Sequence, residues 1–278
     1  MSGGPCYADD LVVVDSATQL DQGHASAVAV VGSHGGRYPA RLAARAGVRA
    51  IVFNDAGVGR DRAGVSGLDD LGDLGVPAAA VSHVTARIGD GGDTLRHGTV
   101  SSVNAPARAL GCEVGMPCQE AVRTLAGSVA APAPPAPAEE ARHLLRDGRP
   151  RVWALDSASL AGPDDEGDVL VTGSHGGLLG GTPGTALRAA AAAAVFNDAG
   201  VGRDAAGLGR LPPWTRGASR RPRCPPRPPG WVTGAPPTTT ACCRRGTRPP
   251  RASAPVRACR RPNSSASCWP HWKTTTLD

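Results

Sequence analysis

Short apolar runs alternate with polar and glycine-rich stretches along the first part of the chain. Four of them, made of Leu, Ile, Val, Ala and Phe, occupy residues 11–14, 27–31, 50–53 and 78–81. Runs of four or five residues that are apolar at every position are typical of strands covered on both faces. The pattern therefore predicts a mainly parallel sheet flanked by helices.

Helical patterns connect these runs. Residues 38–47 (YPARLAARAG) and 64–75 (GVSGLDDLGDLG) read as helices between strands, and residues 98–110 are predicted to form a further helix that carries Asn104. Residues 87–93 would form the loop before it. An Ala- and Pro-rich stretch, residues 129–140, predicts an extended and fairly stiff linker, followed by a short helix in AEEARHLLRDG.

The chain contains an internal repeat. Residues 52–61 and 195–204 share the ten letters VFNDAGVGRD, and GSHGG occurs at 32–36 and again at 173–177. Equivalent positions are 141 residues apart up to and including GSHGG, and 143 residues apart from VFNDAGVGRD onward. An internal repeat of this length indicates two related structural units.

We therefore expect an α/β protein, a tandem repeat of a small, doubly wound, mainly parallel sheet domain that resembles Rossmann-like doubly wound proteins in general and no particular family. The expected parts are a first repeat (8–127), a linker with a short helix (128–149), an incomplete second repeat (150–212) and a disordered basic tail (213–278). Strand ends rich in Gly and polar residues place any ligand site at the carboxyl edge of the sheets.

The charge of the chain is divided unevenly between these parts. Residues 1–211 contain 17 Arg, no Lys and 23 acidic residues, a net charge of 17 − 23 = −6, whereas residues 212–278 contain 12 Arg, one Lys and one Asp, a net charge of +12. The tail also carries 14 of the 26 Pro and 5 of the 8 Cys, with very few large aliphatic residues. Such a composition cannot bury enough apolar surface to offset the entropy of ordering.

A change of reading frame accounts for this tail. The repeat offset places the counterpart of the segment RIGDG, which begins at Arg87, at residues 230–234, which read GWVTG. Read from one nucleotide earlier, the codons of GWVTG permit RLGDG, and codons 235–244 permit RSTYDDGVLS, against GDTLRHGTVS in the first repeat. We infer a one-nucleotide insertion or deletion near Pro212, so the second repeat is truncated and the tail is not an evolved structure.

The inferred frameshift also affects which partners and which cellular compartment we expect. A nucleic-acid-binding arm would need a basic surface with interleaved aromatics, and the frameshift explains the Arg and Trp of the tail without one. The tail cysteines lack C-x-x-C spacing, and Cys6, Cys112 and Cys118 read as reduced thiols. Without a signal peptide or an apolar stretch of about 20 residues, we expect a cytoplasmic protein with no membrane partner.

The strand ends supply the candidate chemistry. His34 is the candidate general acid or base, oriented by Asp15 or Asp55, and His175 and Asp198 are its repeat equivalents. An anionic substrate would be held by glycine amides and small polar groups. The candidate ligand-binding residues are Gly32, Ser33, Gly35, Gly36, Asn54, Gly57, Gly59, Asp90, Gly173, Ser174, Gly176, Gly177 and Asn197.

Alternatives to this site remain open. The set Asp15, Asp55, Asp90 and His34 could instead hold a divalent metal, the only cofactor considered. The glycines could simply serve tight turns, and Arg203 could be a solvated loop residue or meet the charge of an anionic ligand. His83 is interpreted as a solvent or packing residue, because its codon in the second repeat cannot encode His.

Two functions follow. The first is an enzyme, a hydrolase or lyase, that acts on a small anionic metabolite by His/carboxylate acid–base chemistry. The second is a non-catalytic ligand-binding or regulatory module that uses the same loops. The two repeats are expected to pair within the chain or through homo-oligomers, and the first is expected to be folded while the second is only partly so.

Overall fold

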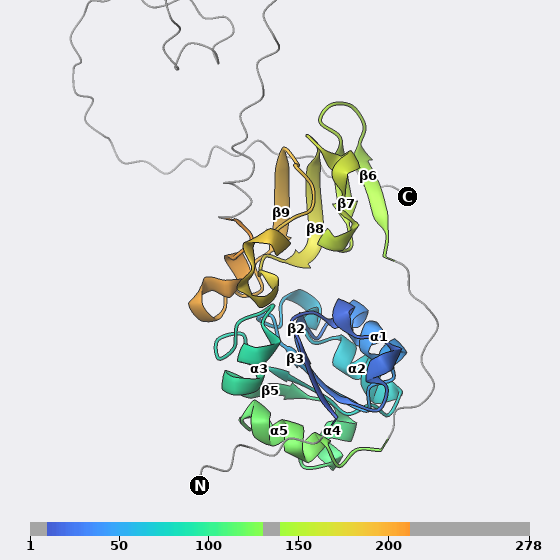
Figure 1. Cartoon of the computed structure of the whole chain (residues 1–278), viewed down its shortest axis with the longest axis vertical. Helices are drawn as coiled ribbons and strands as arrows, with labels where there is room; N and C mark the ends of the chain where they lie inside the picture. The colour runs from blue at the N-terminus through green and yellow to red at the C-terminus, as the bar shows by residue number, and fades with distance from the viewer. Residues whose placement is uncertain (1–9, 130–139, 212–278) are drawn as a thin grey trace, which may run out of the picture. The chain divides into compact units, whose positions relative to one another are not determined.

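A computed structural model describes residues 10–129 and 140–211 (Figure 1). The predicted tail, residues 213–278, and most of the Ala- and Pro-rich linker lie outside the described residues. The first repeat forms a sheet of five strands, the second repeat one of four. The protein is therefore an α/β protein with two mixed, mainly parallel sheets.

In the first sheet the strands lie side by side in chain order. They are β1 (Leu11–Val14), β2 (Val28–His34), β3 (Ala50–Asn54), β4 (Ala78–Val81) and β5 (Val100–Val103). The first four are parallel, and β5 is antiparallel to β4. The four apolar runs of the sequence thus form the four parallel strands, as predicted.

Helices cover both faces of this sheet (Figure 1). They are α1 (Arg37–Ala46), α2 (Gly67–Asp73), α3 (Gly91–His97), α4 (Ala105–Ala109) and α5 (Cys118–Leu125). One core packs α1 and α2 against residues such as Val31 and Phe53. The other packs α4 and α5 against Val30 and Val52.

The strand order differs from the doubly wound expectation. A doubly wound sheet reverses its strand order, whereas β1 to β4 follow one another without reversal. Right-handed crossovers then put the helices between consecutive strands on one face, and the other face is covered only by elements after β4. The helices of the second face therefore come from residues 91–125, which matters for the second repeat.

The second repeat reproduces the first at the expected offsets. The second sheet contains β6 (Arg142–Arg146), which comes from the segment predicted as linker and short helix, followed by β7 (Val152–Leu155), β8 (Val169–His175) and β9 (Ala193–Asn197) of the second repeat, in that order. Strands β7, β8 and β9 are parallel and correspond to β1, β2 and β3. The 3-10 helices at Ala158–Leu160 and Pro163–Asp165 likewise correspond to Ala17–Gln19 and Gln22–His24.

Two predicted helices differ in the structure, and the second repeat lacks one helix of the first. Residues 142–146 form β6, an exposed edge strand antiparallel to β7, because Leu144 and its neighbours pair with Trp153 and its neighbours along the edge. Residues 98–110 form β5 and the short α4, with Asn104 as the helix N-cap. In the second repeat the counterpart of α1 is replaced by two 3-10 turns, Leu179–Gly181 and Pro183–Thr185.

The predicted reduced thiols agree with the structure where it describes them. Cys112 and Cys118 are free and buried, and burial raises the pKa of Cys118 to about 12. Across residues 10–129 and 140–211, no helix is long and apolar enough to cross a membrane.

Candidate functional site

A cavity of about 320 Å³ lies at the carboxyl ends of β2 and β8. We call it the central cavity. Its wall includes His34 and Tyr38 from the first repeat and His175 and Arg210 from the second. A smaller cavity of about 170 Å³ shares His34 and His175 and adds Gly59 and Asn197. Both histidines predicted as catalytic therefore lie where the two repeats meet.

Each histidine is held by its own glycine loop. The N–H of Gly36 donates to Nδ1 of His34, and the N–H of Gly177 donates to Nδ1 of His175, both at 3.1 Å. Because Nδ1 accepts a hydrogen bond, the neutral ring carries its proton on Nε2. The GSHGG sequence therefore fixes the ring and its tautomer in each repeat.

The imidazole rings of His34 and His175 lie next to each other in an edge-to-face arrangement. Their ring centroids are 6.3 Å apart and the rings are nearly perpendicular. Burial lowers the pKa of His34 to about 4. Burial, and then the charges of His34 and Arg210, lower the pKa of His175 to about 3. At neutral pH the pair is therefore uncharged and offers two N–H donors rather than two cations.

Arg210 places a buried positive charge in the wall of the same cavity. Its side chain is largely buried and donates to the carbonyl oxygens of Gly177 and Ala186, each at 2.9 Å. Within the described part of the chain, its side chain makes no ion pair with a carboxylate, and burial lowers its pKa. The residue of the first repeat that is equivalent to Arg210 is Gly67. This change from glycine to arginine between the repeats is the sequence signal that could have identified Arg210.

The carboxylates expected beside His34 are bonded elsewhere. Asp55 is buried and accepts from the N–H of His83 at 2.9 Å, lies 2.8 Å from Nδ1 of the His83 ring, and accepts from Ser101 Oγ at 2.8 Å. The interpretation of His83 as a solvent or packing residue did not anticipate this contact. His83 orients Asp55 across the ends of β3 and β4. Sequence distance gave no sign of that pairing.

Asp15 and Asp90 serve the first turn of α3. Asp15 Oδ1 accepts from the N–H of Gly91 at 3.1 Å, and Asp90 caps the helix by accepting from the N–H of Asp93 at 2.7 Å. Neither makes a hydrogen bond to His34 in the structure. The predicted His34–carboxylate pair is therefore not formed here.

The polar residues expected around a substrate are mostly used by the backbone. Ser33 Oγ accepts from the N–H of Ala17, and Ser174 Oγ accepts from the N–H of Ala158. The side-chain oxygen of Asn54 accepts from the N–H of Ala56, and its amide donates to the carbonyl oxygen of Ala86. These side chains hold the strand ends in place.

The second-repeat equivalents behave in the same way. Asn197 accepts from the N–H of Ala199 at 2.8 Å, and Asp198 accepts from the N–H of Gly200 at 3.0 Å. Asp198 is exposed in the structure and makes no hydrogen bond to His175. It therefore closes a turn rather than orienting a base.

The glycines expected to bind an anion through their amides already donate within the protein. The N–H groups of Gly35 and Gly176 donate to the carbonyl oxygens of Asn54 and Asn197. Those of Gly36 and Gly177 donate to the histidines, and those of Gly57 and Gly59 close their own turn.

Close packing explains the remaining glycines. A Cβ at Gly32 would clash with the backbone nitrogen of Asp90, and one at Gly173 would lie 2.7 Å from the carbonyl oxygen of Asp156. Turn geometry and close approach therefore account for these loops better than an amide cradle does.

The metal alternative does not fit the described residues. Asp15, Asp55 and Asp90 bond to three different partners, and within residues 10–129 and 140–211 no group of three or more His, Cys, Asp or Glu side chains could hold a metal ion. The acidic residues predicted as ligands are instead part of the packing at the sheet edge.

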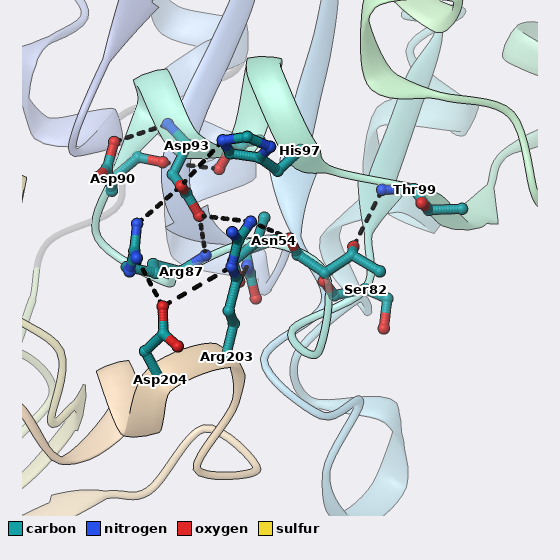
Figure 2. Close-up of polar contacts among 12 residues, drawn as sticks. Asn54, Ser82, Arg87, Asp90, Asp93, His97, Thr99, Arg203 and Asp204 are labelled. Carbon is teal, nitrogen blue, oxygen red and sulfur yellow. Dashed lines mark hydrogen bonds and ion pairs between the residues drawn. The ribbon is translucent and has the colours of Figure 1, made fainter.

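A charged network joins the repeats beside this site (Figure 2). Arg87 pairs with the buried Asp93 at 2.8 Å and with Asp204 of the second repeat at 2.5 Å. Arg203 lies 3.6 Å from Asp93 and donates to the carbonyl oxygen of Thr85 at 2.9 Å. Arg203 is thus neither a solvated loop residue nor part of the cavity wall.

Comparisons with protein-family models, with curated proteins and with solved structures found no match to this chain. The function must therefore be argued from the site alone.

Proposed function

We propose that the chain binds a small anionic ligand in the central cavity, against the wall formed by His34, His175 and Arg210. The supporting observation is the buried guanidinium of Arg210, which among the described residues donates only to carbonyl oxygens and lies 5.5 Å from the centroid of the Phe196 ring, with no carboxylate partner. A buried charge is costly unless it is paired, so an anion that reaches Arg210 would recover part of that cost.

The other residues of the cavity wall indicate which further chemical groups the ligand should carry. Glu140 and Asp156 also line it. Asp156 accepts from the N–H of Ala141 and Glu140 Oε2 accepts from Ser159 Oγ, whereas the buried Oε1 of Glu140 has no hydrogen-bond partner among the described residues and could accept from a donor group on the ligand. The neutral histidines add hydrogen-bond donors without adding charge. A carboxylate- or phosphate-bearing metabolite with further polar groups matches this combination.

Proton-transfer catalysis at the same cavity is a second candidate. It is favoured by the two imidazoles, which lie next to each other in the wall of one cavity. The low pKa values make both rings weak bases in the free protein, but a bound anion would stabilise the protonated form and raise those pKa values. The acid–base pair would then be two histidines rather than a histidine and a carboxylate.

Ligand titration tests the binding proposal. Inorganic phosphate, acetate and succinate are titrated into the full chain by calorimetry, and at least one is expected to bind. Arg210→Gln should weaken that binding by about tenfold or more, the effect of losing one charge-assisted hydrogen bond. Arg146→Gln, at an exposed position of β6, is the matched control. Equal affinity in the Arg210 variant and the parent chain would exclude the proposed site.

Asparagine variants separate binding from catalysis. Asn can replace Nδ1 of His34 or His175 as acceptor for the glycine N–H, but it supplies neither Nε2 nor a titrating group. With a phosphate or carboxylate ester that the parent turns over, loss of turnover with binding retained in H34N or H175N supports catalysis. If the anion binds but the histidine pKa values measured by NMR do not rise, the catalytic candidate fails and the binding proposal stands.

A further inference from the structure

The two repeats meet at equivalent residues. His34 faces His175, its own counterpart at offset 141, and Gly57 packs against Gly200, its counterpart at offset 143. A Cβ built at Gly57 would lie only 2.9 Å from the Cα atom of Gly200. Residues that touch their own counterparts lie on a local two-fold axis, as in an isologous dimer interface.

A two-fold axis also implies that each contact away from the axis is formed twice, once by a residue pair and once by the equivalent pair with the repeats exchanged. In the structure, the loop that carries Arg203 and Asp204 contacts the first repeat, where the N–H of Arg203 donates to the carbonyl oxygen of His83 at 2.7 Å and Asp204 pairs with Arg87 (Figure 2). The symmetric set would join Arg60 and Asp61 to the counterpart of residues 83–93. That counterpart falls at residues 226–236, outside the described residues.

The first-repeat loop is correspondingly open. Arg60 and Asp61 have the same sequence context as Arg203 and Asp204, yet their side chains are 94% and 86% exposed, and among residues 10–129 and 140–211 they form an ion pair only with each other, at 3.3 Å. The side chains of Arg203 and Asp204 are 30% and 58% exposed. Identical residues thus make the interface on one side of the axis and not on the other.

A second observation points to the same missing segment. Val30 and Val52 are fully buried under α4 and α5, whereas their counterparts Val171 and Val195 are 36% and 52% exposed. The segment that covers this face in the first repeat, residues 91–125, has its counterpart at residues 234–268. Among the described residues, nothing covers the equivalent face of β8 and β9 with an apolar layer.

We propose that both surfaces are binding surfaces for one occupant, the segment that codons 213–268 encode in the alternative frame. In that frame codon 230 permits Arg, the counterpart of Arg87, and this Arg pairs with Asp61 as Arg87 pairs with Asp204. The same segment supplies the layer over Val171 and Val195. The present chain therefore carries one half of a two-fold interface that the intact gene product completes.

The proposal also states what should not recur. Codon 236 in the alternative frame reads NCC, which permits Ser, Pro, Thr or Ala but not Asp. The pair between Arg203 and Asp93 therefore has no symmetric equivalent, and Arg60 is left with the backbone carbonyls that correspond to those of His83 and Thr85. In the completed interface, only the Arg–Asp pair equivalent to Arg87–Asp204 and the contacts with backbone carbonyls are formed on both sides of the axis.

The gene itself gives a test that does not depend on folding. For Arg at codon 230, the third base of the Pro229 codon must be C or A. For Asp at codon 233, the third base of the Val232 codon must be G. Genomic DNA that meets both conditions supports the proposal. A different third base at either codon overturns it.

Protein with the frame repaired gives the second test. One nucleotide added at the codons of Pro212 and Pro213 produces the repaired full-length chain, to be compared with the present chain by hydrogen exchange. Amides of β8 and β9 are expected to exchange about tenfold more slowly, or slower still, in the repaired chain, because their open face becomes covered. Equal exchange in the two chains would overturn the proposed cover.

A pair of matched variants tests the Arg–Asp contact. Asp61→Asn should speed exchange in the loop at residues 56–61 of the repaired chain and leave the present chain unchanged. Asp204→Asn, which breaks a pair already formed, should speed exchange at residues 199–208 in both chains. If Asp61→Asn has the same effect in both chains, Asp61 is not an interface residue.

Discussion

The two repeats share strands at equivalent positions but not the burial of those strands. Val52 on β3 is fully buried, whereas Val195, the equivalent residue on β9, is 52% exposed. The strands themselves pair in the same parallel order in both repeats. The comparison teaches that a short apolar run and a parallel neighbour are enough to form a strand, whereas a core also requires the helices that arrive later in the chain.

Truncation of equivalent phenylalanines should show the largest contrast between the repeats. Phe53 is fully buried, and Phe53→Ala is expected to cost about 3–5 kcal/mol in the free energy of unfolding. Phe196, its counterpart, is only partly buried, so Phe196→Ala should cost about 1–2 kcal/mol. Hydrogen exchange with peptide resolution measures both. Equal costs would mean that the second repeat has a core as complete as the first.

The histidine pair should give the next largest effect, through pH. The folded pKa values of His34 and His175, about 4 and about 3, lie below the unfolded value of 6.5. The unfolded state therefore binds protons that the folded state does not as the pH falls below 6.5. Unfolding free energy should drop by up to about 1.4 kcal/mol per pH unit for each histidine between pH 6.5 and about 4.

Urea unfolding at several pH values measures this slope. H34N and H175N should each flatten it, since Asn keeps the contact with the glycine N–H and cannot be protonated. His143→Asn, at an exposed position of β6, should leave the slope unchanged. If H34N flattens the slope and H175N does not, the two rings do not form one buried pair and the central cavity is open on the side of the second repeat.

Glycine substitutions at the contact between repeats should have the smallest effect. Gly57→Ala introduces a Cβ against the backbone of Gly200 at a residue with φ of 72°, and we expect a cost of about 1–3 kcal/mol. Gly75→Ala, just after α2, has a similar φ of 73° and no atom within 4 Å of the added Cβ, so it carries the backbone strain alone. The difference between the two variants, measured by thermal unfolding, reports the contact between the repeats. No difference would mean that this contact is not maintained in solution.

Much of the fold could be predicted from the sequence. The four apolar runs became β1 to β4, and YPARLAARAG and GVSGLDDLGDLG became α1 and α2. These predictions succeed because periodicity is a local property, decided by which faces of a short segment must be covered. The short helix predicted in AEEARHLLRDG, residues 138–148, is wrong for the opposite reason, since residues 142–146 form a strand that depends on β7 as its neighbour.

The candidate site was predicted only in part. GSHGG correctly placed both histidines at the strand ends, where they line the central cavity. The choice of Asp15 or Asp55 as the partner of His34 did not match the structure, because Asp55 bonds to His83 and Ser101, and both residues arrive from other strand ends. Arg210 was missed because nothing in its local sequence shows that its side chain turns inward.

The sequence by itself determined the positions of the parallel strands of the first repeat and the relationship between the repeats. The first is carried by neighbouring residues and the second by a nearly constant offset between equivalent positions. Only the tertiary structure decided which histidine meets which carboxylate, that His34 faces His175, and that one arginine is buried between the repeats. Those outcomes depend on lateral packing between segments far apart in the chain, and no local pattern of side chains encodes it.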